Sequence, residues 1–250
     1  MKERREYVAV LAFLAAIIGI SGCSRQKEEK LTKYDTQFFE LFDTVTSVTG
    51  YARDEKTFQS YVDVFYDELK EYHQLYDIYN DYEGINNIKT INDHAGIEPV
   101  EVDDKIIQML EEAVDIYELT DGNMNVAMGS VLSIWHEYRE AGLKHPEQAQ
   151  LPPQEELEEA AKHMDIRKMV IDPEKKTVYL EDPDMSLDVG AIAKGYAAEM
   201  ASRKVEEAGL KHALISVGGN IRCIGTKPDG QKWVVGVQNP DTTSGERYLH

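Results

Sequence analysis

The chain has 250 residues, and its 46 acidic side chains outnumber its 27 basic ones, so the formal net charge at pH 7 is -19. So acidic a surface is repelled by nucleic acid and by anionic lipid headgroups, which excludes proteins that bind either through a basic face. With 42% hydrophobic residues, the chain can bury one large core or two closely joined lobes.

The first 22 residues have the organisation of a secretory signal. Lys2, Arg4 and Arg5 precede an almost wholly apolar run from Tyr7 to Ile20, and Ser21-Gly22-Cys23 follows. The run is shorter than the ~20 residues of a comfortable membrane span, which favours a cleaved signal over an uncleaved anchor helix. The segment resembles a bacterial lipobox, which implies cleavage before Cys23 and a lipid such as palmitate on its thiol. We expect a lipid-anchored domain on the extracytoplasmic face of the cell membrane.

Residues 23–36 are expected to form a tether between anchor and fold, because 26–33 is short, polar and rich in charge. The folded domain is then expected over 37–250. If Cys23 is acylated, the other cysteine, Cys223, has no partner for a disulfide within the chain. We interpret Cys223 as a small apolar residue buried in a strand.

Periodicity predicts alternating helices and strands beyond the tether. A strand is predicted over 38–51, and helices are predicted over 55–76 and 103–119, where apolar side chains recur at helical spacing. The second helix ends at Asp121-Gly122, a common stop signal. The polar stretch 140–159 predicts an exposed loop that leads into a short acidic helix over 153–162. Its acidic face lacks the spacing of a calcium loop and is interpreted as solvated.

The second half of the chain is predicted to be rich in strands. A hairpin is predicted over 169–172 and 177–180, a helix over 195–208, and strands over 212–217, 221–224 and 233–238. A strand and a helix followed by antiparallel strands indicate an α+β domain and not a doubly wound dinucleotide fold.

The turn before the predicted helix at 195–208 combines small residues with one acid and one lysine. Gly190 and Ala191 leave little bulk over the main-chain amides, and the N-terminus of a helix favours anions. Lys194 adds a positive charge, while Asp188 can accept hydrogen bonds from a ligand or orient a metal-bound water. A tight turn whose small residues serve only packing explains the same spacing, so the turn alone leaves both interpretations open.

Several motifs in one order resemble the ApbE family, the FAD:protein FMN transferases. They are Thr120-Asp121-Gly122-Asn123-Met124-Asn125-Val126-Ala127-Met128-Gly129, Leu187-Asp188-Val189-Gly190-Ala191-Ile192-Ala193-Lys194-Gly195-Tyr196-Ala197, Val217-Gly218-Gly219-Asn220-Ile221 and Gly225-Thr226-Lys227-Pro228-Asp229-Gly230. The resemblance extends over about residues 38–240. It implies an ApbE-like, T-fold-like α+β architecture of antiparallel sheets with packed helices.

The resemblance also implies an activity. Members of the family bind FAD and Mg²⁺, break the pyrophosphate and join FMN by a phosphoester to a threonine of another protein, releasing AMP. Such a reaction places charge on phosphoryl oxygens, so it needs a cation and positioned donors more than a strong nucleophile. The expected acceptors are extracytoplasmic redox subunits with a Ser/Thr-rich flavinylation motif, of the Rnf or Nqr type or with an FMN-binding domain.

Matching the turn to the family assigns its ligand contacts. The match implies that the main-chain carbonyl of Ala191 binds the metal and that Asp188 and Lys194 contact FAD. Mg²⁺ favours oxygen ligands such as carbonyls and carboxylates.

The resemblance assigns further flavin contacts upstream. Asn123, Met124 and Asn125 correspond to a segment that lies along the flavin, and Asn125 replaces a frequent aspartate, so an acceptor is kept while the charge is lost. Tyr79 falls where the family places an aromatic ring that stacks on the ligand, and Phe42 falls where many members have methionine. His136 is either a general base or a structural histidine.

The sequence departs from the family pattern at its C-terminal end. Family members carry, downstream of the last predicted strand, a His-containing segment and then an Asp and a Thr or Ser that complete the metal site. Residues 247–250 do not match that segment, so the expected catalytic residues are unknown and the C-terminal part of the fold is expected to be missing here. Two functions stay open: a flavin transferase, and a non-catalytic extracellular lipoprotein that binds flavin.

Overall fold

The larger sheet of the computed structural model is antiparallel and has four strands. The structure describes residues 30–241, 243, 245 and 248–249, so the predicted signal peptide, Cys23 and most of the tether lie outside the described residues. The strands lie in the order β1-β2-β6-β7 and span Thr32–Phe38 (β1), Thr46–Ala52 (β2), Ala213–Val217 (β6) and Asn220–Ile224 (β7). The predicted strands at 212–217 and 221–224 are confirmed.

The single strand predicted over 38–51 is only partly confirmed: residues 46–51 belong to β2, whereas residues 39–45 form a loop and Phe38 is the last residue of β1. β1 pairs with β2 from Thr32↔Ala52 to Phe38↔Thr46, with a loop over 39–45. The expected tether therefore ends too late, since residues 32–36 belong to β1. β1 is an edge strand whose outward side chains are polar, whereas Tyr34 stacks on Phe58 at 5.5 Å between ring centroids. Edge strands of sheets are often charged, so their composition does not indicate a strand.

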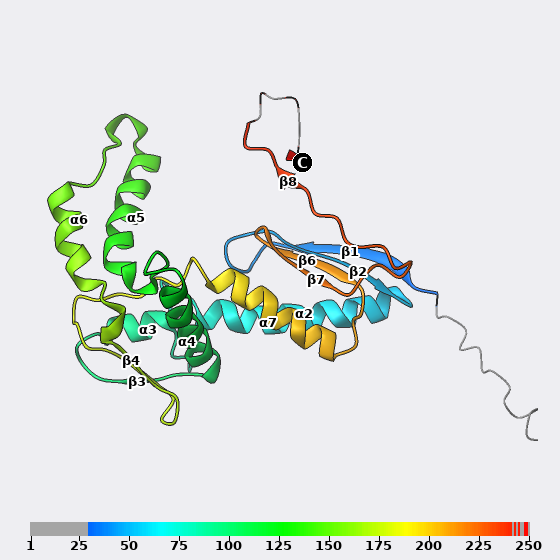
Figure 1. Ribbon diagram of the computed structural model, residues 1–250, viewed down its shortest axis with the longest axis horizontal. Coiled ribbons are helices and arrows are strands. Elements are labelled where there is room, and N and C mark those ends of the chain that lie inside the picture. Colours follow the sequence, from blue (N-terminus) through cyan, green and yellow to red (C-terminus); the bar gives the residue numbers. More distant parts are fainter. Residues whose placement is uncertain (1–29, 242, 244, 246–247, 250) are drawn as a thin grey trace, which may run out of the picture.

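Two helices cover one face of this sheet, α2 (Glu55–Leu75) and α7 (Ala193–Glu207) (Figure 1). Five members of the predicted stripe of α2 are buried, namely Phe58, Val62, Phe65, Leu69 and Tyr72, whereas the sixth, Tyr61, is half-buried. Helix α2 begins after Asp54, whose side chain accepts a hydrogen bond from the Thr57 N–H at 2.7 Å. Helix α7 begins two residues before its predicted start.

The opposite end of α2 meets a second group of elements (Figure 1). It contains α3 (Ile88–Asp93), α4 (Asp104–Leu119) and a small antiparallel sheet of order β3-β5-β4, with β3 at Val100–Glu101, β4 at Met169–Asp172 and β5 at Thr177–Leu180. The predicted hairpin is confirmed by the β4–β5 pairing from Met169↔Leu180 to Asp172↔Thr177. The predicted helix over 103–119 is confirmed as α4, with Asp103 as its N-cap.

The polar middle of the chain is more helical than predicted. Helices α5 (Gly129–Lys144) and α6 (Gln154–Ala160) form an arm, so the expected loop begins at 145 and not at 140. Only Gly129 of α5 is buried, and without an apolar stripe the helix leaves no periodic signal. The acidic face of α6 is solvated, as predicted.

The strand predicted over 233–238 is largely wrong. Only Val237–Gln238 (β8) is a strand, paired with Tyr248–Leu249 (β9), and this segment extends away from the main sheet (Figure 1). The side chain of Val234 is 85% exposed, so the apolar alternation there has no surface on which to pack. Cys223 lies in β7 as predicted but is half-buried.

Together these elements confirm the α+β class. Helices pack on antiparallel sheets, and one hydrophobic core runs from the main sheet through α2 to α4. Within the described residues, no helix combines the length and the apolar character needed to cross a membrane.

Candidate functional site

A cleft of about 380 Å³ lies where the C-terminal end of α2, the β1–β2 loop and the start of α7 meet. Four of the predicted site residues line it: Phe42, Tyr79, Asp188 and Lys194. A second hollow of about 260 Å³ shares Tyr79 and Asp188 with the first and adds His136 from α5. A larger hollow of about 810 Å³ lies at the other end of α2, and no predicted site residue lines it. The first two hollows, called the central cleft below, form the candidate site.

The β1–β2 loop enters the cleft in an uncommon backbone conformation. Phe42 and Asp43 have φ values of 55° and 50°, in the left-handed region that non-glycine residues seldom adopt. The Phe42 N–H donates a hydrogen bond to His73 Nδ1 at 3.3 Å. The loop also meets the β6–β7 turn so closely that a Cβ added to Gly218 would lie 2.6 Å from the Thr44 hydroxyl oxygen. Contacts on both sides therefore hold a loop that is strained at two residues.

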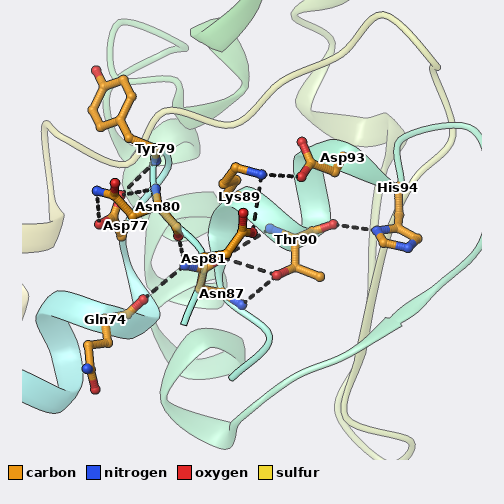
Figure 2. Close-up of polar contacts among 10 residues, drawn as sticks. All are labelled: Gln74, Asp77, Tyr79, Asn80, Asp81, Asn87, Lys89, Thr90, Asp93 and His94. Carbon is orange, nitrogen blue, oxygen red and sulfur yellow. Dashed lines mark hydrogen bonds and ion pairs between the residues drawn. The ribbon is translucent and has the colours of Figure 1, made fainter. Parts of the chain in front are cut away.

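The loop after α2 presents Tyr79, and the Asp77 carboxylate orders it (Figure 2). One oxygen of Asp77 accepts hydrogen bonds from the N–H groups of Tyr79 and Asn80 at 2.7 and 3.0 Å. The other accepts from the Asn80 amide at 2.9 Å and from the Tyr82 hydroxyl at 2.8 Å. Burial alone would raise the pKa of Asp77, but these hydrogen bonds hold it below its usual value.

The ring of Tyr79 is 59% exposed although its backbone is fixed. It lies 5.5 Å from the His136 ring, with 33° between the two planes. Partial burial and the nearby carboxylate of Asp188 raise the pKa of the Tyr79 hydroxyl. The residue therefore offers a neutral aromatic face to the cleft, on which a flat ring can stack.

Asp188 lines both hollows from a second wall, a segment that is fixed by its backbone. The Asp188 N–H donates to the Val126 carbonyl at 2.8 Å, and the Gly129 N–H donates to the Ser186 carbonyl at 2.9 Å. A Cβ at Gly129 would lie 2.4 Å from the Ser186 carbonyl oxygen, so this approach requires glycine. One carboxylate oxygen of Asp188 accepts from the Gly190 N–H at 2.8 Å. Among the described residues, the other oxygen has no hydrogen-bond donor.

The turn at the start of α7 leaves donors and a cation free. The N–H groups of Ile192 and Ala193 both donate to the Val189 carbonyl, at 3.0 and 2.8 Å. Within the described chain, the N–H groups of Lys194 and Gly195 make no such bond, and no carboxylate lies within ion-pair distance of the Lys194 ammonium. This is the arrangement that an anion-binding turn requires.

The oxygen atoms of the same turn suit a hard cation. Ala191 is exposed, and its carbonyl accepts no backbone hydrogen bond from the residues that the structure describes. Ala191 is not among the residues that line either hollow. Its carbonyl and the uncommitted oxygen of Asp188 are oxygen ligands of the kind that Mg²⁺ favours. The Ala191 carbonyl and Asp188 are thus the residues here that could hold the ion.

The structure does not bring Asn123, Met124 and Asn125 into the lining of the cleft. The amide of Asn125 is already engaged: it donates to the Met164 carbonyl at 2.9 Å and accepts from the Ala127 N–H at 2.9 Å. Asn123 donates to the Thr120 carbonyl at 2.7 Å. Flavin contact by these three residues therefore stays a prediction.

A possible metal cluster outside the cleft is His163, Asp182 and Asp184, whose ligand atoms lie within 4.8 Å of one another. The Lys168 ammonium lies 2.7 Å from one oxygen of Asp182, and His163 Nδ1 lies 3.0 Å from the other. The charge of this buried carboxylate is already balanced, so we assign no ion to the cluster.

Sequence reasoning missed four residues that shape the cleft: Asp77, Asn87, Thr90 and Asn92. The run Asp77-Ile78-Tyr79-Asn80 is typical of a turn in which the aspartate side chain accepts hydrogen bonds from N–H groups two or three residues later. A sequence signal for the role of Asp77 was therefore present. Asn87 and Thr90 form a capping box, a sequence pattern that predicts the start of α3. Asn92 contacts Leu187, 95 positions away, and no local pattern reveals such a contact.

Known proteins share both the sequence and the fold. Residues 42–250 match the ApbE family model, and the chain belongs to the ApbE family. It is 30% identical over 151 residues to the FAD:protein FMN transferase of Haemophilus influenzae. The matched region covers 60% of this chain and 42% of that protein. It is 25% identical over 230 residues to the FAD:protein FMN transferase of Vibrio cholerae. Here the matched region covers 92% of this chain and 65% of that protein.

Solved structures confirm the ApbE-like α+β architecture. The crystal structure of the ApbE protein from Thermotoga maritima superposes with a TM-score of 0.70 at 27% identity, covering 84% of this chain and 64% of that one. The flavin transferase ApbE from Vibrio cholerae has the same fold, with a TM-score of 0.67 at 20% identity. The chain spans 42% to 65% of the length of the two relatives named above.

Proposed function

We propose that this protein transfers FMN from FAD to a threonine hydroxyl of an acceptor protein and releases AMP, in a reaction that requires Mg²⁺. We base this on one observation: in a chain of net charge -19, Lys194 lines a cleft beside Tyr79 and Asp188, and no described residue pairs with its ammonium or with the N–H groups of Lys194 and Gly195. A flavin dinucleotide has a flat ring system and a diphosphate, and the cleft offers an aromatic face and cationic donors to match them.

Different residues of the cleft bind different parts of the ligand. Lys194 and the N–H groups at the start of α7 bind the diphosphate, while Tyr79 and Phe42 contact a ring of the ligand. Mg²⁺, when bound near Ala191 and Asp188, neutralises charge on the phosphoryl oxygens. The threonine oxygen forms a bond to the FMN phosphorus, the bond from that phosphorus to the oxygen of AMP breaks, and the threonine proton passes to a base or to water.

The proposal extends to where the acceptor lies. With lipid on Cys23, the protein is held at the extracytoplasmic face of the cell membrane. The acceptors are then redox subunits on the same face, of the Rnf or Nqr type or with an FMN-binding domain, in which the threonine lies in a Ser/Thr-rich motif. The charge of -19 supports an acceptor that is itself not strongly acidic.

The test is an in vitro transfer reaction. Purified protein with FAD, Mg²⁺ and an acceptor domain should add the mass of FMN to the acceptor and release AMP in equal amount. An acceptor with threonine replaced by alanine should gain nothing, and a chelator should stop the reaction. FAD binding without any mass gain would favour the second candidate, a non-catalytic flavin-binding lipoprotein. Absence of FAD binding would remove both.

A variant of the turn tests the role of the cation. Lys194→Ala should raise the dissociation constant for FAD at least ~10-fold, because charge-assisted contacts to phosphate contribute about 1.5–3 kcal/mol. Fluorescence quenching of FAD measures this constant. Lys175→Ala is the matched control, since Lys175 pairs with Asp172 on the β4–β5 turn and neither residue lines the cleft. An unchanged constant for the Lys194 variant would remove the lysine from the site.

A further inference from the structure

Helix α3 carries an asparagine near each of its ends, and each asparagine binds the backbone of a different wall of the central cleft. Asn87 is the N-cap of the helix and is fully buried. Asn92 lies in its last turn and is half-buried. Neither residue is among the predicted ligand contacts, and both bind main-chain groups. Asn92 also lines the second hollow of the cleft.

Asn87 holds the wall that presents Tyr79 (Figure 2). Its amide nitrogen donates to the Asn80 carbonyl at 2.9 Å and to the Gln74 carbonyl at 3.2 Å. Its carbonyl oxygen accepts from the Thr90 N–H at 3.1 Å. One side chain thus joins the last turn of α2, the residue after Tyr79 and the start of α3. In addition, the Lys89 N–H of α3 donates to the Asp77 carbonyl at 3.0 Å.

Asn92 holds the wall that presents Asp188. Its amide nitrogen donates to the Leu187 carbonyl at 2.9 Å, and its carbonyl oxygen accepts from the Leu187 N–H at 2.7 Å. Leu187 is fully buried and lies outside every strand, so its backbone groups need partners. Asn92 supplies both partners, as a neighbouring strand would, and so fixes the residue that precedes Asp188.

We propose that α3 sets the distance between the two walls of the flavin cleft, and that Asn87 and Asn92 are its positioning residues. The inference rests on the proposed function, because it takes Tyr79 and Asp188 as the residues that meet FAD. The walls are more than a hundred positions apart in sequence, and both are anchored to the same six-residue helix. The cleft is therefore organised before the ligand arrives, and binding does not have to order it.

The chemistry of the amide makes the roles specific. The backbone of Leu187 offers one donor, its N–H, and one acceptor, its carbonyl. The asparagine side chain pairs with both, because its amide has an acceptor oxygen and a donor nitrogen at the right distance from the backbone. In Asn92→Asp the acceptor for the Leu187 N–H is kept, but a carboxylate then faces the Leu187 carbonyl. In Asn92→Ala both bonds are lost.

The experiment compares FAD binding with stability in the full chain. Asn92→Ala and Asn87→Ala should each raise the dissociation constant for FAD at least ~10-fold, measured well below the melting temperature. Asn86→Ala is the matched control, because Asn86 is the neighbouring asparagine and donates to the Glu101 carbonyl at 2.8 Å, not to a cleft wall. It should leave the constant for FAD unchanged even where it lowers the melting temperature. Folded Asn92 and Asn87 variants with the wild-type constant would overturn the proposal.

A second measurement on the unaltered protein covers the case in which the variants do not fold. Hydrogen exchange of the wild-type chain without FAD should show slow exchange at the N–H groups of Leu187 and Lys89, and FAD should slow them little further. Fast exchange without FAD would contradict a pre-organised cleft. A wild-type protein that binds no FAD would instead contradict the proposed function, and the exchange result would still decide the role of α3.

Discussion

Asp182 is a buried carboxylate whose neighbours keep it ionised. The Lys168 ammonium is its strongest partner at 2.7 Å, and further hydrogen bonds come from the Asp184 N–H and from His163. The hydrogen bond from Lys168, together with these two, lowers the pKa of Asp182 to about 2, although burial opposes the change. A carboxylate with a lowered pKa in the folded state stabilises that state wherever it is ionised.

The pH dependence of stability tests this balance. The contribution of Asp182 should be complete above pH ~4, the range of an unfolded aspartate, and should be lost as the pH falls toward about 2. Its size is roughly 1–2 kcal/mol. Urea unfolding between pH 2 and 6 should therefore show a smaller acid-dependent loss for Asp182→Asn than for the wild type. The neighbouring Asp184, whose side chain is 72% exposed, gives the control: Asp184→Asn should follow the wild-type curve.

Among the elements, α2 contributes most visibly to the core, since its buried face meets both the main sheet and α7. Leu69 of this helix is fully buried. Leu69→Ala should lower the free energy of unfolding by about 2–5 kcal/mol, because it removes apolar contacts and leaves a cavity. Lys70→Ala, an exposed neighbour on the same helix, should change it by less than about 0.5 kcal/mol. Similar losses in the two variants, measured by urea unfolding, would contradict the packing of α2.

Elements with one apolar face could be predicted from sequence, and elements without one could not. Helices α2 and α4 carry buried stripes, and their predicted bounds agree with the structure to within one residue. Helix α5 has no such stripe, and β1 is a charged edge strand. In the site, the turn at Asp188 and Lys194 could be predicted from small residues beside charges. The support of that turn by Asn92 could not, because it depends on a contact formed only in the folded chain.

At the scale of the whole molecule, anchoring to the membrane is a prediction that cysteine chemistry can test. Cells fed labelled palmitate should label the wild-type protein and retain it in the membrane fraction. Cys23→Ala should lose the label and pass to the soluble extracytoplasmic fraction, because the predicted acyl anchor would be attached at Cys23. Cys223→Ala, a change of the only other cysteine in the sequence, should keep both label and location. Label on the Cys23 variant would contradict the lipobox interpretation.

The placement of α2 affects which acceptor proteins the cleft can reach. Its N-terminal end lies beside the first described residues, at the end of the sheet where β1 begins (Figure 1). Its C-terminal end borders the cleft. At 1.5 Å per residue, a helix of 21 residues is about 30 Å long. If lipid on Cys23 holds that end at the membrane and α2 stands upright on it, the cleft would lie about 30 Å above the bilayer. It would then serve acceptors whose threonine projects to a similar height and pass over threonines that lie flush with the lipid surface.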